Sequence, residues 1–304
     1  MCINRRNAQY ILPGNSRHYY YMVDEKLVTK KLAEEAGVPC PRTYAVIEYW
    51  RDVRDKIEHV LGSYPSFVIK PNRGSAGRGI MVLESDLKGG CTSSDGTPVA
   101  ELEIRYQITS ILSGLYSLSE LPDKVMIEQR IFPHTFFNGM TWNGTPDIRI
   151  ILYHTIPVMA MLRLPTKTSG ARANLHQGAV GVGIAIMTGI TRTAVCRNDQ
   201  VTHHPDTGAL LVGLQMPYWD ALIESSQKLA EYIPLSYIGV DFMLDQTIGP
   251  TLIEANARPG LNIQIANVIG LRPRLEYIDQ AIKTGDSLED IRAHYFEQLK
   301  NHTL

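Results

Sequence analysis

The stretch Tyr237–Asn262, YIGVDFMLDQTIGPTLIEANARPGLN, decides how the rest of the chain is interpreted. Its pattern predicts a strand at 237–244, a polar turn at 245–250, a return strand at 251–255 and a tight bend at 257–260. If the hairpin closes symmetrically about residues 246–249, Asp241 lies directly opposite Glu254. Alternation along the strand then points Asn256 to the same face as Glu254.

Two carboxylates and an amide in one patch imply a specific chemistry. Ionised carboxylates at that distance repel each other, so the patch predicts a hard cation held by oxygen ligands, most plausibly magnesium. The predicted ligands are Asp241, Glu254 and Asn256. The alternative is a half-buried hairpin whose acids are solvated on its outer face.

The composition is that of an ordinary globular protein, with 304 residues of which 44% are hydrophobic and 20% charged. The net charge of -1 gives no general electrostatic case for nucleic acid or a membrane surface. The sequence has neither a signal-peptide pattern at its start nor an apolar run of about 18 residues. Its four cysteines lie far apart, which fits a reducing compartment. We expect a cytoplasmic protein without nucleic-acid or membrane partners.

A second informative stretch is FVIKPNRGSAGRGIMVL at 67–83, an apolar strand, a glycine-rich loop and a second strand. The glycines let the backbone approach an anion, and Lys70, Arg73 and Arg78 add positive charge. No Gly-Lys-Ser/Thr ends the loop and strands flank it, so it is neither a Walker A loop nor a Rossmann fingerprint. The stretch predicts a hairpin that closes over phosphates, and an ordinary flexible hairpin is the alternative.

The rest of the chain alternates hairpins with helices. Helices are predicted at 27–36, 49–61, 101–118, 218–232, 263–282 and 287–299, and further strands at 43–47, 125–131, 147–153, 156–165, 181–187 and 191–196. A polar loop at 166–178 is rich in donors, and the segment 132–146 is aromatic. We predict an α+β fold with a short N-terminal helical and linker segment (1–64), a lid subdomain with the glycine-rich loop (65–130) and a C-terminal subdomain (131–304).

These motifs, in this order, resemble the ATP-grasp superfamily, and within it most closely the RimK-type α-L-glutamate ligases and their relatives. The resemblance covers roughly residues 24–262 and includes DEKLVTKKLAEEAGVPCP, FVIKPNRGSAGRGI, VMIEQRI, DIRIIL, ARANLHQG and GVDFML…LIEANARPG. The last three are specific, because residues 172–178 follow the family's Arg-Ser-Asn-Leu-His-Arg-Gly loop and Asp…Glu-x-Asn is the superfamily's metal signature. The resemblance implies two hairpin-rich lobes that clasp ATP between them and a much reduced N-terminal domain.

The resemblance also implies a role for each matching residue. Lys70 would hold the α-phosphate, the glycine loop the β- and γ-phosphates, Glu128 and Gln129 the adenine, and Asp147 the ribose hydroxyls. Asp241, Glu254 and Asn256 would hold two magnesium ions, for which manganese is a substitute. The full set implied to bind ATP is Lys26, Lys70, Arg73, Gly74, Ser75, Gly77, Gly79, Glu128, Gln129, Ile131, Asp147, Arg172 and Asn174.

The implied reaction is the ligation of a carboxylate to an amine through an acyl phosphate. Arg163 or Arg172 would stabilise the tetrahedral oxyanion, and the sequence leaves that choice open. Arg258 replaces the small residue of the family's Asn-x-Ser-Pro-Gly bend, where it would grip a substrate carboxylate or pair with a nearby acid. The expected substrates are an amino acid, glutamate by analogy, and a carboxylate-bearing peptide or small molecule. A homo-oligomer is compatible with the sequence.

Two other functions remain open. An ATP-grasp protein that phosphorylates a hydroxyl, or assists glycan assembly, would stop at phosphoryl transfer, and a non-enzymatic module would only bind ATP. Release of ADP that depends on an amine distinguishes the ligase from the first alternative. The presence of Lys70, Asp241, Glu254 and Asn256 argues against the second.

Overall fold

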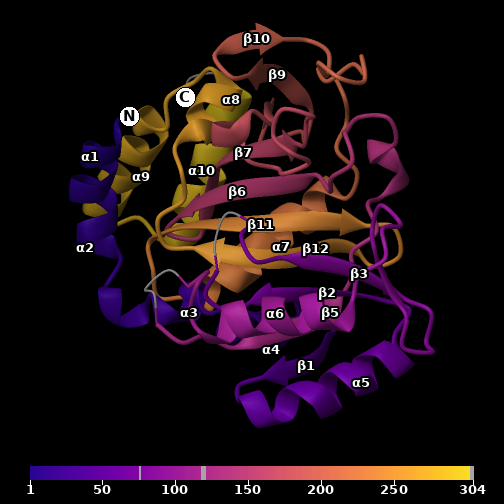
Figure 1. The fold of residues 1–304 in the computed structure, drawn as a ribbon. Helices are drawn as coiled ribbons and strands as arrows, with labels where there is room; N and C mark the ends of the chain where they lie inside the picture. The colour runs from indigo at the N-terminus through magenta and orange to yellow at the C-terminus, as the bar shows by residue number, and fades with distance from the viewer. Residues whose placement is uncertain (75–76, 118–120, 302–304) are drawn as a thin grey trace. The chain divides into compact units, whose positions relative to one another are not determined.

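The computed structural model describes residues 1–74, 77–117 and 121–301, and the chain divides into two compact units. Unit 1 comprises residues 1–24, 28–39 and 132–304, and unit 2 comprises residues 25–27 and 40–131. Both units combine an antiparallel sheet with helices, so the predicted α+β class is confirmed (Figure 1). Within the described ranges, no helix is long and apolar enough to cross a bilayer.

Unit 2 is a five-stranded sheet with two long helices. The strands, in the order β1-β5-β2-β3-β4, are β1 (Thr43–Ile47), β5 (Val125–Gln129), β2 (Ser66–Pro71), β3 (Met81–Ser85) and β4 (Cys91–Ser93). Helices α5 (Val53–Ser63) and α6 (Glu101–Leu112) share one apolar core with Phe67, Ile69 and Ile127. Because successive side chains of a strand alternate, Lys70 of β2 and Glu128 of β5 lie on the other face of this sheet.

Two features of unit 2 differ from the sequence-based expectation. Residues 40–64, which the sequence grouped with an N-terminal segment, belong to this unit because β1 pairs with β5 and α5 packs on the same core. The helix expected at 101–118 ends at Leu112. Gly114 there has a φ of +85°, and a side chain on it would lie 2.3 Å from the Leu121 carbonyl oxygen, so the chain turns where only glycine fits.

Unit 1 contains a seven-stranded sheet in the order β10-β9-β8-β7-β6-β11-β12. The strands are β6 (Asp147–Tyr153), β7 (Ile156–Leu164), β8 (Val180–Ile184), β9 (Thr191–Cys196), β10 (Asp199–Val201), β11 (Tyr237–Asp245) and β12 (Gly249–Asn256). The helices are α1 (Ile3–Arg6), α2 (Leu12–Gly14), α3 (Tyr21–Asp24), α4 (Lys26–Glu35), α7 (Trp219–Glu231), α8 (Asn262–Asn267), α9 (Arg272–Thr284) and α10 (Leu288–Lys300).

Both faces of the central strands are buried, which is why their sequences are continuously apolar over long runs. Ile151, Tyr153, Met161 and Tyr237 form a core on one face with residues of α8, α9 and α10. Helix α8 lies on β7, β8 and β9, and α7 contacts β6, β7 and β11 (Figure 1). The alternate residues of the same strands, such as Ile150, are also fully buried.

The N-terminal residues, to which the sequence assigned no chemistry, are part of this core. Tyr10 and Ile11 lie in a π-helical turn (Asn7–Ile11) and pack with the residues beneath α9 and α10. The buried side chain of Asn15 donates to the carbonyl oxygens of Tyr237 and Ala257 at 2.7 and 3.0 Å. The start of the chain is therefore tied directly to both ends of the β11–β12 hairpin.

The helix expected at 263–282 is two helices, α8 and α9. Val268 has a φ of 53°, in the left-handed region that ends a helix, and Pro273 occupies the first turn of α9. The neighbouring expectations for α7 and α10 are confirmed to within a residue at each end. In α10 the Ser287 hydroxyl caps the first turn by accepting from the Asp290 backbone nitrogen at 3.1 Å.

Candidate functional site

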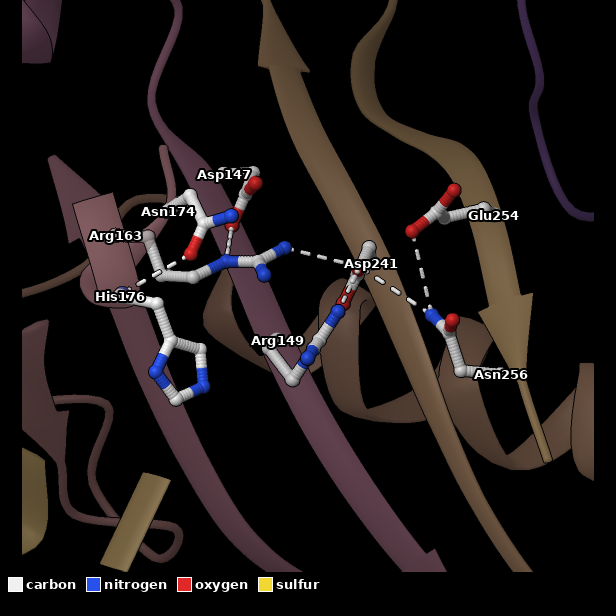
Figure 2. A network of polar contacts seen from close by, with 8 residues as sticks. All are labelled: Asp147, Arg149, Arg163, Asn174, His176, Asp241, Glu254 and Asn256. Atoms are coloured by element: carbon white, nitrogen blue, oxygen red, sulfur yellow. Dashed lines mark hydrogen bonds and ion pairs between the residues drawn. The ribbon is translucent and has the colours of Figure 1, made fainter. Parts of the chain in front are cut away.

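One end of a sheet face in unit 1 carries the charged residues that Figure 2 shows, and the other end belongs to the apolar core. On β6 the residues that share this face read Asp147, Arg149, Ile151 and Tyr153. Antiparallel pairing sets Asp147 opposite Arg163 of β7 and Arg149 opposite Asp241 of β11. Asp241 in turn lies opposite Glu254 of β12. The register of four strands therefore brings together residues from distant parts of the sequence.

The pairing of Asp241 with Glu254 is the one predicted, but the hairpin reaches it by a different route. Asp245 pairs with Gly249, so the turn is one residue shorter than expected. The register then shifts between Asp241 and Phe242, where Ile253 is the extra residue of a β-bulge. The bulge restores the expected alignment of the two carboxylates.

Two arginines neutralise Asp241, which is 2% exposed. Arg149 donates from Nε to Oδ1 at 2.7 Å and from Nη2 to Oδ2 at 2.5 Å, and Arg163 Nη2 donates to Oδ2 at 2.9 Å. Burial acts to raise the pKa of Asp241, but the two guanidinium groups outweigh it and hold the pKa below its usual range. Asp241 is therefore an ionised carboxylate at neutral pH.

Asp147 is in a weaker position, because its partner Arg163 is shared with Asp241. Burial raises the pKa of Asp147 to about 7, the Arg163 charge opposes that shift, and the nearby Asp241 charge adds to it. The carboxylate that the sequence predicted to meet ribose hydroxyls is thus bound to Arg163 in this structure. Its contact with a nucleotide stays a prediction.

The three predicted metal ligands lie together. Asn256 Nδ2 is 3.5 Å from Asp241 Oδ2 and 3.4 Å from Glu254 Oε1, at the limit of hydrogen bonding (Figure 2). Half a turn of the amide would present its oxygen to the same point, so the donor chemistry fits a hard cation. Because Oδ2 of Asp241 already accepts from Arg149, Arg163 and Asn256, a cation there must displace one of these donors.

The amide is needed for this candidate metal site. In residues 1–74, 77–117 and 121–301, no group of three or more His, Cys, Asp or Glu side chains is placed to hold a metal ion. Two carboxylates and Asn256 therefore remain the set that the hairpin offers. Their role as metal ligands stays a prediction.

The loop 166–178 is fixed at its base by its own polar side chains. Thr166 Oγ1 donates to the Gly178 carbonyl oxygen at 2.9 Å and accepts from the Ser169 nitrogen at 3.0 Å. Asn174 Oδ1 accepts from the His176 nitrogen at 3.0 Å and begins the 3-10 turn Leu175–Gln177. Figure 2 shows Asn174 and His176 on the Arg163 side of the network, and Arg172 is exposed.

Arg258 lies outside this network. Its guanidinium group stacks over the ring of Tyr20, with 5.4 Å between Cζ and the ring centroid, rather than pairing with an acid. The buried Arg6 donates to the carbonyl oxygen of the next residue, Pro259. The bend at 257–260 is therefore held by the N-terminal residues.

In unit 2 the buried ammonium group of Lys70 forms an ion pair with Glu128. Lys70 lies opposite Met126 on β5, so Glu128 is its diagonal neighbour on the same face. The sequence had assigned these two residues to different parts of ATP. Gln129 pairs with Arg42 through its backbone nitrogen at 2.8 Å, and Ile131 is 9% exposed just beyond β5.

The glycine-rich loop is held in place by other residues of unit 2. Lys26 Nζ donates to the Gly74 carbonyl oxygen, and Arg73 Nη2 donates to Glu25 at 2.6 Å. Gly77 and Gly79 have φ values of +70° and +73°, and a side chain on Gly79 would lie 2.5 Å from the Tyr116 ring. Ser75, also predicted to contact phosphate, lies outside the described residues.

Sequence reasoning missed Arg149, the residue that makes the most hydrogen bonds to Asp241. The sequence contained a signal for this residue. Arg149 follows Asp147 by two residues in DIRIIL, so both side chains lie on the same face of the strand. The sequence did not show that β6 pairs with β11, because Arg149 and Asp241 are 92 residues apart along the chain.

Comparison with known proteins identifies the fold as an ATP-grasp fold. A profile of the sugar-transfer associated ATP-grasp family matches residues 5–280, and the chain belongs to that family. No curated protein sequence matches the chain.

Solved structures share the fold at low sequence identity. A biotin carboxylase complex from Campylobacter jejuni is 16% identical, with a TM-score of 0.53 over 87% of this chain and 46% of that one. A pyruvate carboxylase from Rhizobium etli is 16% identical, with a TM-score of 0.50 over 84% of this chain and 17% of that one. The ATP-grasp ligase PsnB with a minimal precursor is 14% identical, with a TM-score of 0.47 over 86% of this chain. The chain spans 62% of the length of PsnB.

Replacing Arg149 with glutamine removes two charge-assisted hydrogen bonds from a buried carboxylate while Arg163 remains. We expect the free energy of unfolding, measured by urea denaturation, to fall by about 2–4 kcal/mol. The matched control is Arg192→Gln on β9, where Arg192 is exposed and the change should stay below about 0.5 kcal/mol. Combining Arg149→Gln with Asp241→Asn should cost less than the sum of the two single changes, and strict additivity would contradict the ion pair.

Proposed function

We propose that the chain is an ATP- and magnesium-dependent carboxylate–amine ligase. The observation that carries this proposal is the charged network, in which Asp241, Glu254 and Asn256 converge beside Arg149 and Arg163 on one face of an ATP-grasp sheet. A site of this kind offers oxygen ligands for a cation and guanidinium groups for phosphate or carboxylate oxygens in one place.

Both units carry residues that we propose to contact the nucleotide. In unit 1, Asp241, Glu254 and Asn256 would hold magnesium, with one or two ions and manganese as a substitute, and Arg172 and Asn174 would reach the triphosphate. In unit 2, Lys70 would bind the α-phosphate, the loop 72–79 the remaining phosphates, and residues 128–131 the adenine. When bound, ATP would supply the phosphoryl group that activates a carboxylate, and magnesium would offset the negative charge of the phosphates.

The proposed reaction balances in two steps. A substrate carboxylate oxygen bonds to the γ-phosphorus as the bond to ADP breaks, and the amine nitrogen then bonds to the acyl carbon as phosphate leaves and the nitrogen loses a proton. Catalysis of this kind depends on positioning and on cations near developing negative charge. Arg163, already among the acids, or the exposed Arg172 would meet the oxyanion.

The finer substrate assignment is also a proposal. Glutamate as the added amino acid follows only from the likeness of residues 172–178 to the glutamate ligases, and the acceptor is a carboxylate on a peptide or small molecule. Arg258 remains a candidate for gripping a substrate carboxylate. Tyr20 stacks on one face of the Arg258 guanidinium group. The N–H donors point outward in the plane of the group, so this stacking does not occupy them.

A second function is favoured by one specific observation, the description of the family as associated with sugar transfer. Phosphoryl transfer to a sugar hydroxyl would use the same cations and the same nucleotide. It would release ADP with an acceptor alone, whereas a ligase needs an acceptor and an amine together.

The direct test measures ADP release with magnesium and ATP against amino acids, singly and in pairs, with and without uronic acids, peptides and neutral sugars. ADP release that requires both a carboxylate and an amine supports the ligase. Release with a neutral sugar alone overturns it in favour of the hydroxyl kinase. Tight ATP binding without release under any condition overturns both and leaves a binding module.

Glu254→Gln removes one metal-ligand charge and preserves shape. We expect magnesium-dependent turnover to fall by at least about a hundredfold with little change in melting temperature. Glu224→Gln, on the exposed side of α7, is the matched control and should keep full turnover. Normal turnover of the Glu254 variant would remove the metal site from the proposal.

Lys70→Gln separates the two roles of this lysine. The single change leaves Glu128 buried without its ion pair, so both stability and ATP affinity should fall. Adding Glu128→Gln should restore the melting temperature. Because Glu128 is itself proposed to contact the adenine, the reference for ATP affinity is the Glu128→Gln single variant. The dissociation constant for ATP, measured by titration calorimetry, should be at least about tenfold larger in the double variant than in that single variant. Recovery of ATP affinity in the double variant would show that Lys70 acts only as the partner of Glu128.

A further inference from the structure

A polar groove lies in unit 1 beside the loop 166–178. Its volume is about 520 Å³, which falls within the usual range for a small-molecule site. Three elements form it: the loop itself, the turn between β9 and β10, and the start of α8. The polar side chains that line it are Thr168, His176, Gln177, Arg197, Asn198 and Asn262.

Close packing fixes the walls of this groove. Leu175 lies against Gly181 of β8, where a side chain would come within 2.5 Å of Leu175 Cδ2, so the loop approaches the sheet only because residue 181 is glycine. Helix α8 is tied to the sheet by Thr193 Oγ1, which donates to the Ala266 carbonyl oxygen at 2.6 Å. Gly178 has a φ of +100°, and a side chain on it would lie 2.9 Å from Thr168 Cγ2, so the base of the loop closes around a glycine.

The lining side chains have unused hydrogen-bonding capacity. In the described part of the chain, no hydrogen bond engages the side chains of His176, Gln177, Arg197, Asn198 or Asn262. The described lining residues include no aspartate or glutamate, and Arg197 is a cation. The groove is therefore suited to a ligand rich in acceptors that carries negative charge.

Two residues lie between the groove and the Arg163 side of the charged network (Figure 2). His176 lines the groove, and its backbone nitrogen is bound by Asn174 Oδ1. Figure 2 places both residues on the Arg163 side of the network. A ligand in the groove would thus approach the proposed reaction site from that side.

We propose that this groove binds the acceptor and that the acceptor is an acidic saccharide, a sugar chain that carries carboxylates. This inference builds on the ATP-dependent function proposed above. Side-chain amides donate and accept at once, as sugar hydroxyls do, and Arg197 supplies the partner for a carboxylate. Among the described lining residues, only Leu175 and Ile265 have large apolar side chains, so these residues form no apolar pockets for the side chains of a peptide. The family's association with sugar transfer agrees.

The test measures binding by titration calorimetry without ATP, using tetragalacturonic acid, maltotetraose and tetraglutamate as probes. Tetragalacturonic acid should bind most tightly, and Arg197→Gln should weaken it by about tenfold or more. Arg192→Gln, an exposed arginine on the same hairpin but outside the groove, is the matched control and should leave affinity unchanged. Gln177→Ala should weaken maltotetraose and tetragalacturonic acid alike, because an amide reads hydroxyls rather than charge.

Other outcomes overturn the proposal. Preferential binding of tetraglutamate would make the acceptor a peptide, and binding of no probe, or binding unaffected by Arg197→Gln, would remove the groove as the acceptor site. ADP release measured on the same variants separates this failure from that of the ligase. If the unchanged protein binds the saccharide, Arg197→Gln abolishes that binding and no variant releases ADP, the groove is supported and the ligase is rejected. If ADP release depends on the acceptor and Arg197→Gln does not change it, the ligase is supported and the groove is rejected as the acceptor site.

Discussion

Carboxylates on adjacent strands share a buried face only where positive charge accompanies them, and this requirement organises unit 1. Asp241 is almost fully buried opposite Glu254, and Arg149 and Arg163 compensate for ionising it there. A charge pair 4 Å apart contributes about 4 kcal/mol at an effective dielectric constant of 20, enough to offset much of the burial. The arginines come from β6 and β7, and a slip of one residue in either strand would turn its arginine to the apolar face. Strand register and charge balance therefore depend on each other.

Glycines beside the charges let the surrounding loops approach the sheet closely. Gly181 lies opposite Arg163 and receives Leu175, while Gly239, two residues before Asp241, would place a side chain 2.6 Å from Pro259. The loop 166–178 and the bend 257–260 thus rest on the backbone of the strands that hold the network. Their conformations follow the sheet rather than the packing of large side chains.

The sequence predicted the local features of this site better than it predicted which distant residues contact one another. Period-two alternation and a short turn were enough to align Asp241 with Glu254, although the bulge at Ile253 was not foreseen because bulges leave no clear pattern. The arginine pairing of Asp241 depends on β6, β7 and β11 meeting in one sheet, which is a property of topology and not of any window of residues. The break at Val268 was missed for a related reason, since a non-glycine residue in the left-handed region gives no compositional signal. The structural role of Asn15 could not be predicted, because its hydrogen-bond partners lie more than 220 residues away in the sequence.

The proposed reaction site and the proposed acceptor groove are built from different kinds of structure in unit 1. The acids and arginines that would handle a phosphoryl group stand on strands whose geometry is over-determined by two buried faces. The groove is built from a loop, a hairpin tip and the start of a short helix, which tolerate change more readily. In the part of the chain that the structure describes, Arg197, Asn198 and Asn262 share no hydrogen bond with the Asp241 network. Substitutions in the groove and in the network should therefore affect stability independently. The fold is shared with a biotin carboxylase at 16% identity, and a shared fold does not determine the acceptor, because loops change more readily than the sheet that carries them.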